Sequence, residues 1–300
     1  MINITKYRKV YYSLSGIMIA ASVFALFSWG LKLGIDFTGG SLMEIEYRSE
    51  RPSSDIIKEN FKSVGVDDVH VQPSGDKGAI LRFKDVGEDK HQEILSKLKG
   101  EDKESLAEKS FASIGPTIGS EMKRKSIWAI SLVLAIIVTY IAIAFRKVSS
   151  PMVSWKYGIA TLIALFHDVI VPLGVFAALG KFYNTEIDVA FIAAILTVLG
   201  YSVHDTIIVF DRIRENLAKF SRIEFEEIIN KSLNQTFVRS LNTSMTVLLV
   251  LLAIYFFGGD TIKNFALVLL IGIAAGTYSS IFVASPVLLS WYNWTKRKMR

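Results

Sequence analysis

The sequence predicts an α-helical membrane protein of six spans with one inserted α+β domain. Two observations carry this fold class. Apolar residues make up 51% of the 300 positions, and six stretches come close to the roughly 20 apolar residues that a helix needs to cross a bilayer. Residues 32–126 interrupt these stretches with 16 of the 34 Lys and Arg and 18 of the 28 Asp and Glu. Such a charged segment is typical of a domain in water.

The first apolar stretch, residues 10–31, follows a short basic N-terminus at residues 1–9. A signal peptide begins in the same way, but its apolar core is about 7–15 residues long and leads to a small-x-small cleavage site. This stretch is longer and ends in Phe27-Ser-Trp-Gly30. We therefore interpret it as a retained transmembrane helix.

Five further spans make up residues 127–291, and a basic tail follows at residues 292–300. The last span is longer than a bilayer requires, which predicts a tilt or a late start. The predicted ranges are Ile127–Phe145, Tyr157–Leu179, Ile187–Val209, Val238–Phe257 and Ile262–Trp291.

Lys and Arg residues are distributed unevenly over the segments between these spans. The segments on the side of the two termini carry 16 of them, whereas the two short loops on the other side carry Lys181 and Lys263. Because basic loops stay in the cytoplasm, both termini are predicted to be cytoplasmic and residues 32–126 to lie outside. The formal net charge of +6 therefore follows membrane topology and does not indicate nucleic-acid binding.

Within residues 32–126 the pattern changes to short alternating strands and amphipathic helices. Their order, β-α-β-β-α-β, is that of the split βαβ or ferredoxin-like fold. A hairpin turn is predicted at Pro73-Ser-Gly-Asp76. The predicted strands are Leu42–Tyr47, Val69–Gln72, Ala79–Phe83 and Lys109–Ile114, and the helices begin at Ser53 and Asp89.

The polar residues of this domain form no catalytic or metal-binding pattern. The chain has no Cys, which excludes disulfides, thiolate metal sites and thiol nucleophiles, and no Gly-x4-Gly-Lys-Ser/Thr segment marks an ATP site. His70 and His91 lie on different predicted elements, and we interpret them as solvated or edge residues. Asp67 and Asp68 fit a turn better than a metal site. We therefore expect no enzyme activity, no metal and no cofactor.

Ionisable residues inside the predicted spans are the candidate functional residues. An Asp at the centre of a spanning helix costs about 2.5–3.5 kcal/mol on insertion scales, so it usually faces the bundle interior or water. His167-Asp168 lies midway along the third span, His204-Asp205 lies in the fourth, and Arg239 opens the fifth. Asp205 and Arg239 fall in the same half of the membrane, where an Asp–Arg pair that opens and closes fits a proton relay. A static ion pair or an interfacial cap explains the same pattern.

The other polar and small residues of the spans have simpler interpretations. Asp211, Arg212 and Arg214 lie at the predicted membrane boundary, where charge is tolerated. His167-Asp168 fits hydrogen bonding between helices as well as it fits a relay. Gly272-Ile-Ala-Ala-Gly276 is a small-xxx-small face that predicts close helix packing.

Several of these segments resemble the motifs of one known family. They are Gly34-Ile-Asp-Phe-Thr-Gly-Gly40 after the first span, Ser113-Ile-Gly-Pro-Thr-Ile-Gly119 before the second, His167-Asp168, and the run from Gly200 to Asn216. Over essentially its whole length the chain resembles the SecD/SecF family of protein-export membrane proteins, and its SecF members in particular. This family belongs to the resistance–nodulation–division superfamily. The two long motifs are specific, whereas the His-Asp dipeptide alone is not.

The resemblance implies half of a resistance–nodulation–division transmembrane domain in a bacterial or archaeal cytoplasmic membrane. The implied function is non-enzymatic: an accessory subunit that uses the proton-motive force, without a cofactor, to promote polypeptide export. The implied partners are SecD, the SecYEG channel, the translocating polypeptide and membrane lipid.

The resemblance also implies roles for single residues. The essential intramembrane carboxylate of the family falls on Asp205 and the fifth-span arginine on Arg239, while His204 stands where relatives often carry Asn. His167 and Asp168 join these as candidate relay residues. The family-motif residues are Gly34, Asp36, Gly39, Gly40, Gly200, Asp211 and Arg212.

Two other functions remain open from the sequence. A proton-coupled exporter of a small molecule or lipid has the same architecture, but usually carries a second six-span half in the same chain. A passive scaffold of the export channel needs no titrating residue at all.

Overall fold

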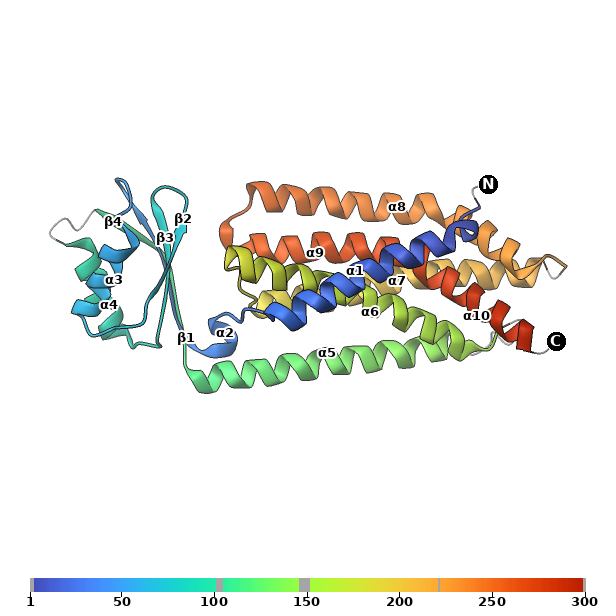
Figure 1. Ribbon diagram of the computed structural model, residues 1–300, viewed down its shortest axis with the longest axis horizontal. Coiled ribbons are helices and arrows are strands. Elements are labelled where there is room, and N and C mark those ends of the chain that lie inside the picture. The colour runs from blue at the N-terminus through green and yellow to red at the C-terminus, as the bar shows by residue number, and fades with distance from the viewer. Residues whose placement is uncertain (1–2, 101–104, 146–151, 221, 299–300) are drawn as a thin grey trace. The chain divides into compact units, whose positions relative to one another are not determined.

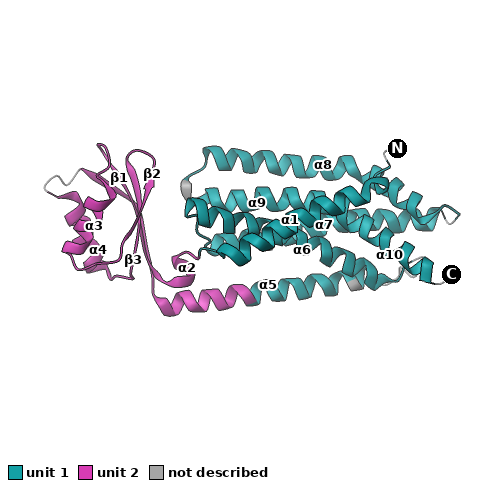
Figure 2. Cartoon of the chain, viewed as in Figure 1, with its two compact units in different colours: residues 1–32, 128–300 teal, residues 33–127 magenta. Residues whose placement is uncertain are grey.

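The structure is a computed structural model, which describes residues 3–100, 105–145, 152–220 and 222–298. It divides into two compact units, residues 33–127 and residues 1–32 with 128–300 (Figure 2). The second boundary falls inside helix α5 (Pro116–Ala144), between Ile127 and Trp128.

Residues 33–127 contain a four-stranded antiparallel sheet in the order β2-β3-β1-β4, with two helices on one face (Figure 1). This arrangement confirms the predicted β-α-β-β-α-β order. The one-turn helix α2 (Ile35–Thr38) precedes the sheet. The remaining elements are β1 (Gly40–Tyr47), α3 (Ser54–Ser63), β2 (His70–Ser74), β3 (Gly78–Phe83), α4 (Glu88–Lys99) and β4 (Leu106–Ile114).

The alternating and helical patterns place one apolar core between the sheet and its helices. Met43 and Ile45 of β1 point to this face and are fully buried, as are Ile57 and Phe61 of α3. Ser53 caps α3 by accepting a hydrogen bond from the Ile56 amide. Ile57 and Phe61 lie four residues apart, on one face of α3, as helical periodicity requires.

The β2–β3 turn lies later than predicted. Pro73 and Ser74 belong to β2 and pair with Ala79 and Gly78, so the turn occupies residues 75–77. Gly75 adopts φ +62°, a conformation that costs glycine little. Proline is accepted in β2 because β2 is an edge strand, where the missing amide hydrogen costs no ladder bond.

The other unit consists of long helices, together with the greater part of α5. Over the described residues, six helical segments of the chain are long and apolar enough to span a membrane. This confirms the six predicted spans. The π-helical segment η2 (Ser280–Ala284) joins α9 to α10. The helices are α1 (Arg8–Trp29), α5, α6 (Ser154–Tyr183), α7 (Val189–Lys219), α8 (Phe225–Phe257), α9 (Asp260–Ser279) and α10 (Ser285–Lys298).

Several helices extend beyond the predicted apolar stretches. Helix α5 begins at Pro116 and α8 at Phe225, whereas the predicted spans began at Ile127 and Val238. Hydropathy detects only the apolar part of a helix, while the backbone ladder continues through charged residues. Proline at the first helical position is favourable because its missing amide hydrogen has no intrahelical acceptor there.

The small-xxx-small face packs α9 closely against α7, as predicted. A Cβ atom on Gly272 would overlap the side chain of Val198, and one on Gly276 would lie 3.0 Å from the Ser202 Cβ atom. Gly174 of α6 allows a similar approach to Ser22 of α1. These contacts bring α7 and α9 close enough for the short side chains of Ser and Thr to interact between helices.

Candidate functional site: two buried carboxylates

Asp168 lies in a buried polar cluster among α6, α7 and α9. Its Oδ2 atom accepts hydrogen bonds from Ser202 and, at 2.7 Å, from Ser279. The Nδ1 atom of His167 lies 2.9 Å from Oδ1. Asp168 and His167 are both 0% exposed, and among the described residues no Lys or Arg nitrogen forms an ion pair with Asp168. Hydroxyl and imidazole groups therefore satisfy this carboxylate.

His167 keeps one ring nitrogen without a partner. Nε2 is buried and has no hydrogen bond within the described part of the chain, and the Tyr278 ring lies beside the imidazole at 5.8 Å between centroids. When Nδ1 donates to Asp168, the free lone pair is on Nε2.

Asp205 lies in a second hydroxyl cluster, formed by α7, α8 and η2. Ser240 donates to its Oδ1 atom at 2.7 Å and Ser280 to Oδ2 at 2.8 Å. The side chain is 5% exposed. Helices α8 and α9 also share a direct hydroxyl pair, because Ser244 Oγ lies 2.6 Å from Thr277 Oγ1. Asp205 is thus a buried carboxylate held by neutral donors.

The predicted ion pair between Asp205 and Arg239 is not formed in the structure. No salt bridge joins them among the described residues; Arg239 is exposed and lines a cavity of about 330 Å³ with Asp211, Arg212 and Glu215. Successive helix residues point about 100° apart. Ser240 faces Asp205, so the residue before it does not.

His204 is likewise outside the Asp205 cluster. Its side chain is exposed on the surface of α7 and makes no hydrogen bond within the described segments. Asp211 and Arg212 form short ion pairs along the same helix, Asp211 with Arg214 at 2.5 Å and Arg212 with Glu215 at 2.6 Å. Gly200 is exposed as well, with open space around it. The charged end of the motif therefore has partners of its own.

Four serines of the two clusters escaped sequence reasoning: Ser202, Ser240, Ser279 and Ser280. Serine is small and common in apolar helices, so its presence gives no signal. Their spacing from Asp168 and Asp205 along the sequence gives no signal either, since Ser240, Ser279 and Ser280 come from other helices. In the structure, the π-helical segment η2 indicates this place as a candidate site, because π-helical turns often mark functional sites.

The glycine motif after the first span packs against the motif before the second. Gly39 adopts φ +75°, and a Cβ atom there would lie 2.7 Å from the Pro116 Cα atom. A Cβ atom on Gly119 would lie 2.8 Å from the Gly39 amide nitrogen. Gly34 precedes α2 and Gly40 begins β1, so the motif turns the chain from helix to sheet, with Asp36 in the first turn of α2.

His91 is buried, which corrects its interpretation as a solvated or edge residue. Its ring stacks on Phe111 at 3.7 Å, Nε2 lies 3.0 Å from Glu108, and Nδ1 lies 3.3 Å from Glu88. Helical periodicity places His91 on the same face as the buried Ile94 and Leu95, and the prediction failed because it followed the polar residue type instead of this spacing. His70 is exposed, as expected. No group of three metal-ligating side chains was found among the described residues.

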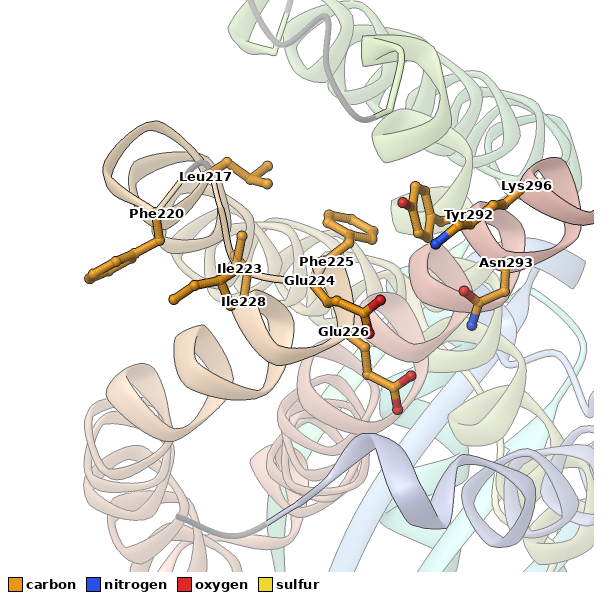
Figure 3. A pocket seen from close by; sticks show the side chains of 10 residues that line it. All are labelled: Leu217, Phe220, Ile223, Glu224, Phe225, Glu226, Ile228, Tyr292, Asn293 and Lys296. Atoms are coloured by element: carbon orange, nitrogen blue, oxygen red, sulfur yellow. The ribbon is translucent and has the colours of Figure 1, made fainter. Parts of the chain in front are cut away.

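A cavity of about 420 Å³ lies at the loop between α7 and α8, beside α10 (Figure 3). Phe225 and Tyr292 meet there at 4.7 Å between ring centroids, and Glu224, Glu226 and Lys296 supply charges to its lining. It contains no residue of either carboxylate cluster. The candidate site is therefore the pair of clusters and not this cavity.

Comparison with known proteins agrees with the motifs. Residues 93–294 match the family profile described as protein export membrane protein SecD/SecF, C-terminal, and residues 24–50 match the SecD/SecF GG motif. The protein translocase subunit SecF of Thermobaculum terrenum is 46% identical over 98% of this chain and 95% of its own length. That of Anaerolinea thermophila is 36% identical over 99% and 98%.

Solved structures show the same fold. The crystal structure of SecDF, a translocon-associated membrane protein from Thermus thermophilus, superposes with a TM-score of 0.83 at 30% identity over 97% of this chain. A crystal structure of SecDF in a super-membrane-facing form gives 0.71 at 29% identity over 99% of this chain. The chain spans 39% and 40% of these longer proteins.

Six apolar helices and these relatives make the chain a multi-pass protein of the cell membrane. Its fold, a helical bundle with a small antiparallel sheet domain, is that of the SecDF structures. The chain belongs to the SecD/SecF family of protein-export membrane proteins, and within it to the SecF subunits of the protein translocase.

Proposed function

We propose that the chain acts with SecD beside the SecYEG channel and uses the proton-motive force to promote polypeptide export, without catalysing a covalent reaction. The observation that carries this proposal is the pair of buried carboxylates, Asp168 and Asp205, in membrane-spanning helices and satisfied by neutral donors. Ionisable residues in such positions are costly and usually functional. They are suited to binding and releasing protons.

The proposed step at Asp205 is a change of hydrogen-bond direction. The ionised carboxylate accepts from Ser240 and Ser280, which ties α7 to α8 and to η2. A bound proton turns one carboxylate oxygen into a donor, so that one serine hydroxyl has to turn away or accept. The loss of one of these hydrogen bonds then favours a different packing of the helices. A charge crossing 100 mV releases about 2.3 kcal/mol, enough to shift a two-state equilibrium nearly fiftyfold.

Arg239 has a different role in this proposal from direct pairing with Asp205. It lines the 330 Å³ cavity with Asp211 and Glu215. The next residue, Ser240, holds Asp205. Arg239 therefore belongs to a charged cluster beside the Asp205 site and has no direct contact with Asp205 among the described residues. His204 is exposed on α7 and is proposed to meet a partner.

The unit of residues 33–127 is proposed to lie outside the membrane and to contact the emerging polypeptide, with both chain termini in the cytoplasm. The positive-inside distribution of Lys and Arg supports this orientation. The two glycine motifs pack against each other within this unit. The two motifs are therefore proposed to move together with this unit.

The test is export of a secreted polypeptide into inverted membrane vesicles, with and without a proton-motive force, in strains lacking the native chain. Asp205→Asn is expected to lose the component of export that depends on the proton-motive force. Asp211→Asn is the matched control, because it neutralises a carboxylate of the same helix that is paired with Arg214. It is expected to retain export.

If export by the Asp205→Asn variant still depends fully on the proton-motive force, the proposal is wrong, and the chain is better explained as a passive scaffold. Recovery of small-molecule export, without an effect on polypeptide export, would instead favour an exporter. Co-purification with SecD and SecYEG tests the partners separately.

A further inference from the structure

We propose that Ser279 and Ser280 are positioning residues that couple the protonation states of Asp168 and Asp205. This inference rests on the proposed function and adds a second proton-binding site with a defined link to the first. Ser279 is the last residue of α9 and Ser280 the first of η2. Ser279 donates to Asp168 at 2.7 Å, and Ser280 donates to Asp205 at 2.8 Å.

The two serines join carboxylates that lie on different helices. Asp168 belongs to α6 and Asp205 to α7, so one peptide unit between Ser279 and Ser280 links sites that are far apart in sequence. Both serines are 0% exposed, and water therefore does not replace the hydroxyl groups. A backbone shift at one serine is passed to its neighbour, because a single planar peptide joins them.

Each serine hydroxyl has a second acceptor one turn earlier in the helix. Ser279 Oγ lies 3.2 Å from the Gly276 carbonyl oxygen, and Ser280 Oγ lies 3.0 Å from the Thr277 carbonyl oxygen. A hydroxyl carries one hydrogen, so it divides its donation between carboxylate and carbonyl. When a proton binds the carboxylate, the hydroxyl hydrogen can turn wholly to the carbonyl. The two orientations are the two states of the link.

The π-helical segment allows Ser279 and Ser280 to change position. A π-helical turn leaves the regular ladder of hydrogen bonds one residue out of step, and such turns occur at functional sites. Ser285, directly after η2, has a buried hydroxyl without a hydrogen bond in the described part of the chain. A shift of the π-helical turn by one residue would rotate the hydroxyl groups at this point while the helix stays intact.

Other charged groups do not provide the coupling directly. Within the described residues, His167 is the titratable side chain that bonds Asp168, with Tyr278 beside its ring. Ser240 and Ser280 bond Asp205, while the neighbouring His204 and Arg239 are exposed. No Lys or Arg nitrogen within the described ranges forms an ion pair with either carboxylate. Two elements therefore touch both sites: the pair Ser279–Ser280, and α7, which carries Asp205 and the Ser202 that bonds Asp168.

The test is an infrared pH titration of the full chain in lipid nanodiscs, following the carbonyl stretch of each protonated aspartic acid. Asp168→Asn and Asp205→Asn assign the two bands. Ser279→Ala is then compared with Ser202→Ala. Both variants remove a hydroxyl from the same Asp168 oxygen, but only Ser279 is bonded to Ser280 in the chain.

Ser279→Ala is expected to move the titration midpoint of Asp205 by about half a pH unit or more, although Ser279 does not bond Asp205. Ser202→Ala is expected to move it less than half as far. The reverse comparison uses Ser280→Ala and Ser240→Ala, which each remove a hydroxyl from Asp205. Only Ser280→Ala is expected to move the titration midpoint of Asp168. If Ser279→Ala does not fold, Ser279→Cys keeps the volume with a weaker donor and is expected to shift the midpoint in the same sense.

An Asp205 midpoint that stays in place in Ser279→Ala would overturn the inference. So would an equal shift in Ser202→Ala, because the coupling would then run along α7. If the bands titrate and Asp205→Asn abolishes export driven by the proton-motive force, the proposed function stands even when the serine link fails. If neither band titrates between pH extremes, both fail together.

Discussion

Ser240, and not Arg239, supplies the hydrogen bond that Asp205 accepts from α8. The hydroxyl of Ser240 lies 2.7 Å from Oδ1 of Asp205, whereas Arg239 is exposed and lines a cavity with Asp211 and Glu215. Two adjacent residues therefore have separate tasks. One satisfies the buried carboxylate, and the other belongs to the charged surface of α7 and α8.

This separation predicts a small coupling energy between Asp205 and Arg239. In a double-mutant cycle of Asp205→Asn and Arg239→Gln on unfolding of the chain in detergent, the interaction energy is expected to stay below about 0.5 kcal/mol. The cycle of Asp205→Asn with Ser240→Ala is the positive control, with an expected value of about 1–3 kcal/mol. A larger value for the arginine cycle would show that the two side chains pair in solution.

The contact between Gly39 and Pro116 predicts a strong effect of a single methyl group. Gly39→Ala places a Cβ atom 2.7 Å from backbone and also forces alanine into φ +75°. Gly65→Ala has nearly the same φ, +77°, but open space around it. Gly65→Ala is expected to cost about 1–2 kcal/mol from conformation alone, and Gly39→Ala clearly more.

Hydrogen exchange of the β1 and β4 amides in the full chain measures this difference. Those amides are expected to lose more protection in Gly39→Ala than in Gly65→Ala. Equal losses would mean that the glycine motif is needed for its backbone conformation and not for close packing.

Gly174 predicts a similar contrast within the helical bundle. A Cβ atom on Gly174 of α6 would overlap the backbone of Ser22 in α1, whereas Gly16 of α1 has open space. Gly174→Ala is expected to lower the thermal midpoint of the purified chain, with a cost of about 1–3 kcal/mol from overpacking. Gly16→Ala is expected to stabilise α1 by up to about 1 kcal/mol through helix propensity. Equal midpoints would indicate that α1 and α6 can separate freely.

The Glu88–His91–Glu108 cluster predicts a dependence of α4 on acid. A hydrogen bond from Gln92, and then one from His91, holds the pKa of Glu88 below its ordinary value of 4.5. A carboxyl whose pKa is lowered by folding stabilises the folded state above its unfolded pKa and loses that contribution as the pH falls through the folded value. Protection of the α4 amides is therefore expected to fall below about pH 4.5.

Glu88→Gln is the matched variant, because it keeps the shape but does not ionise. Its α4 amides are expected to show a flatter pH dependence of hydrogen exchange than those of the unsubstituted chain. Identical profiles would assign the acid sensitivity to other carboxyl groups.

The sequence by itself determined the six spans, the βαββαβ order and the candidate residues Asp168 and Asp205. It could do so because hydropathy, alternation and the cost of a buried charge are local properties of neighbouring residues. Ends of helices were less well predicted, since α5 and α8 continue through charged residues that hydropathy does not count. His91 was predicted to be solvated because histidine is polar. Its burial depends on Glu88, Glu108 and Phe111 as partners, which only the structure identifies.

Only the tertiary structure decided what surrounds each carboxylate. Ser240, Ser279 and Ser280 are inconspicuous in sequence, and they reach Asp168 and Asp205 from other helices. Close packing of α9 against α7 at Gly272 and Gly276 brings the end of α9, and with it Ser280, near Asp205. The direction of a side chain around a helix also depends on helix rotation, which is fixed by contacts between helices. For this reason the serine next to Arg239, and not Arg239 itself, became the partner of Asp205.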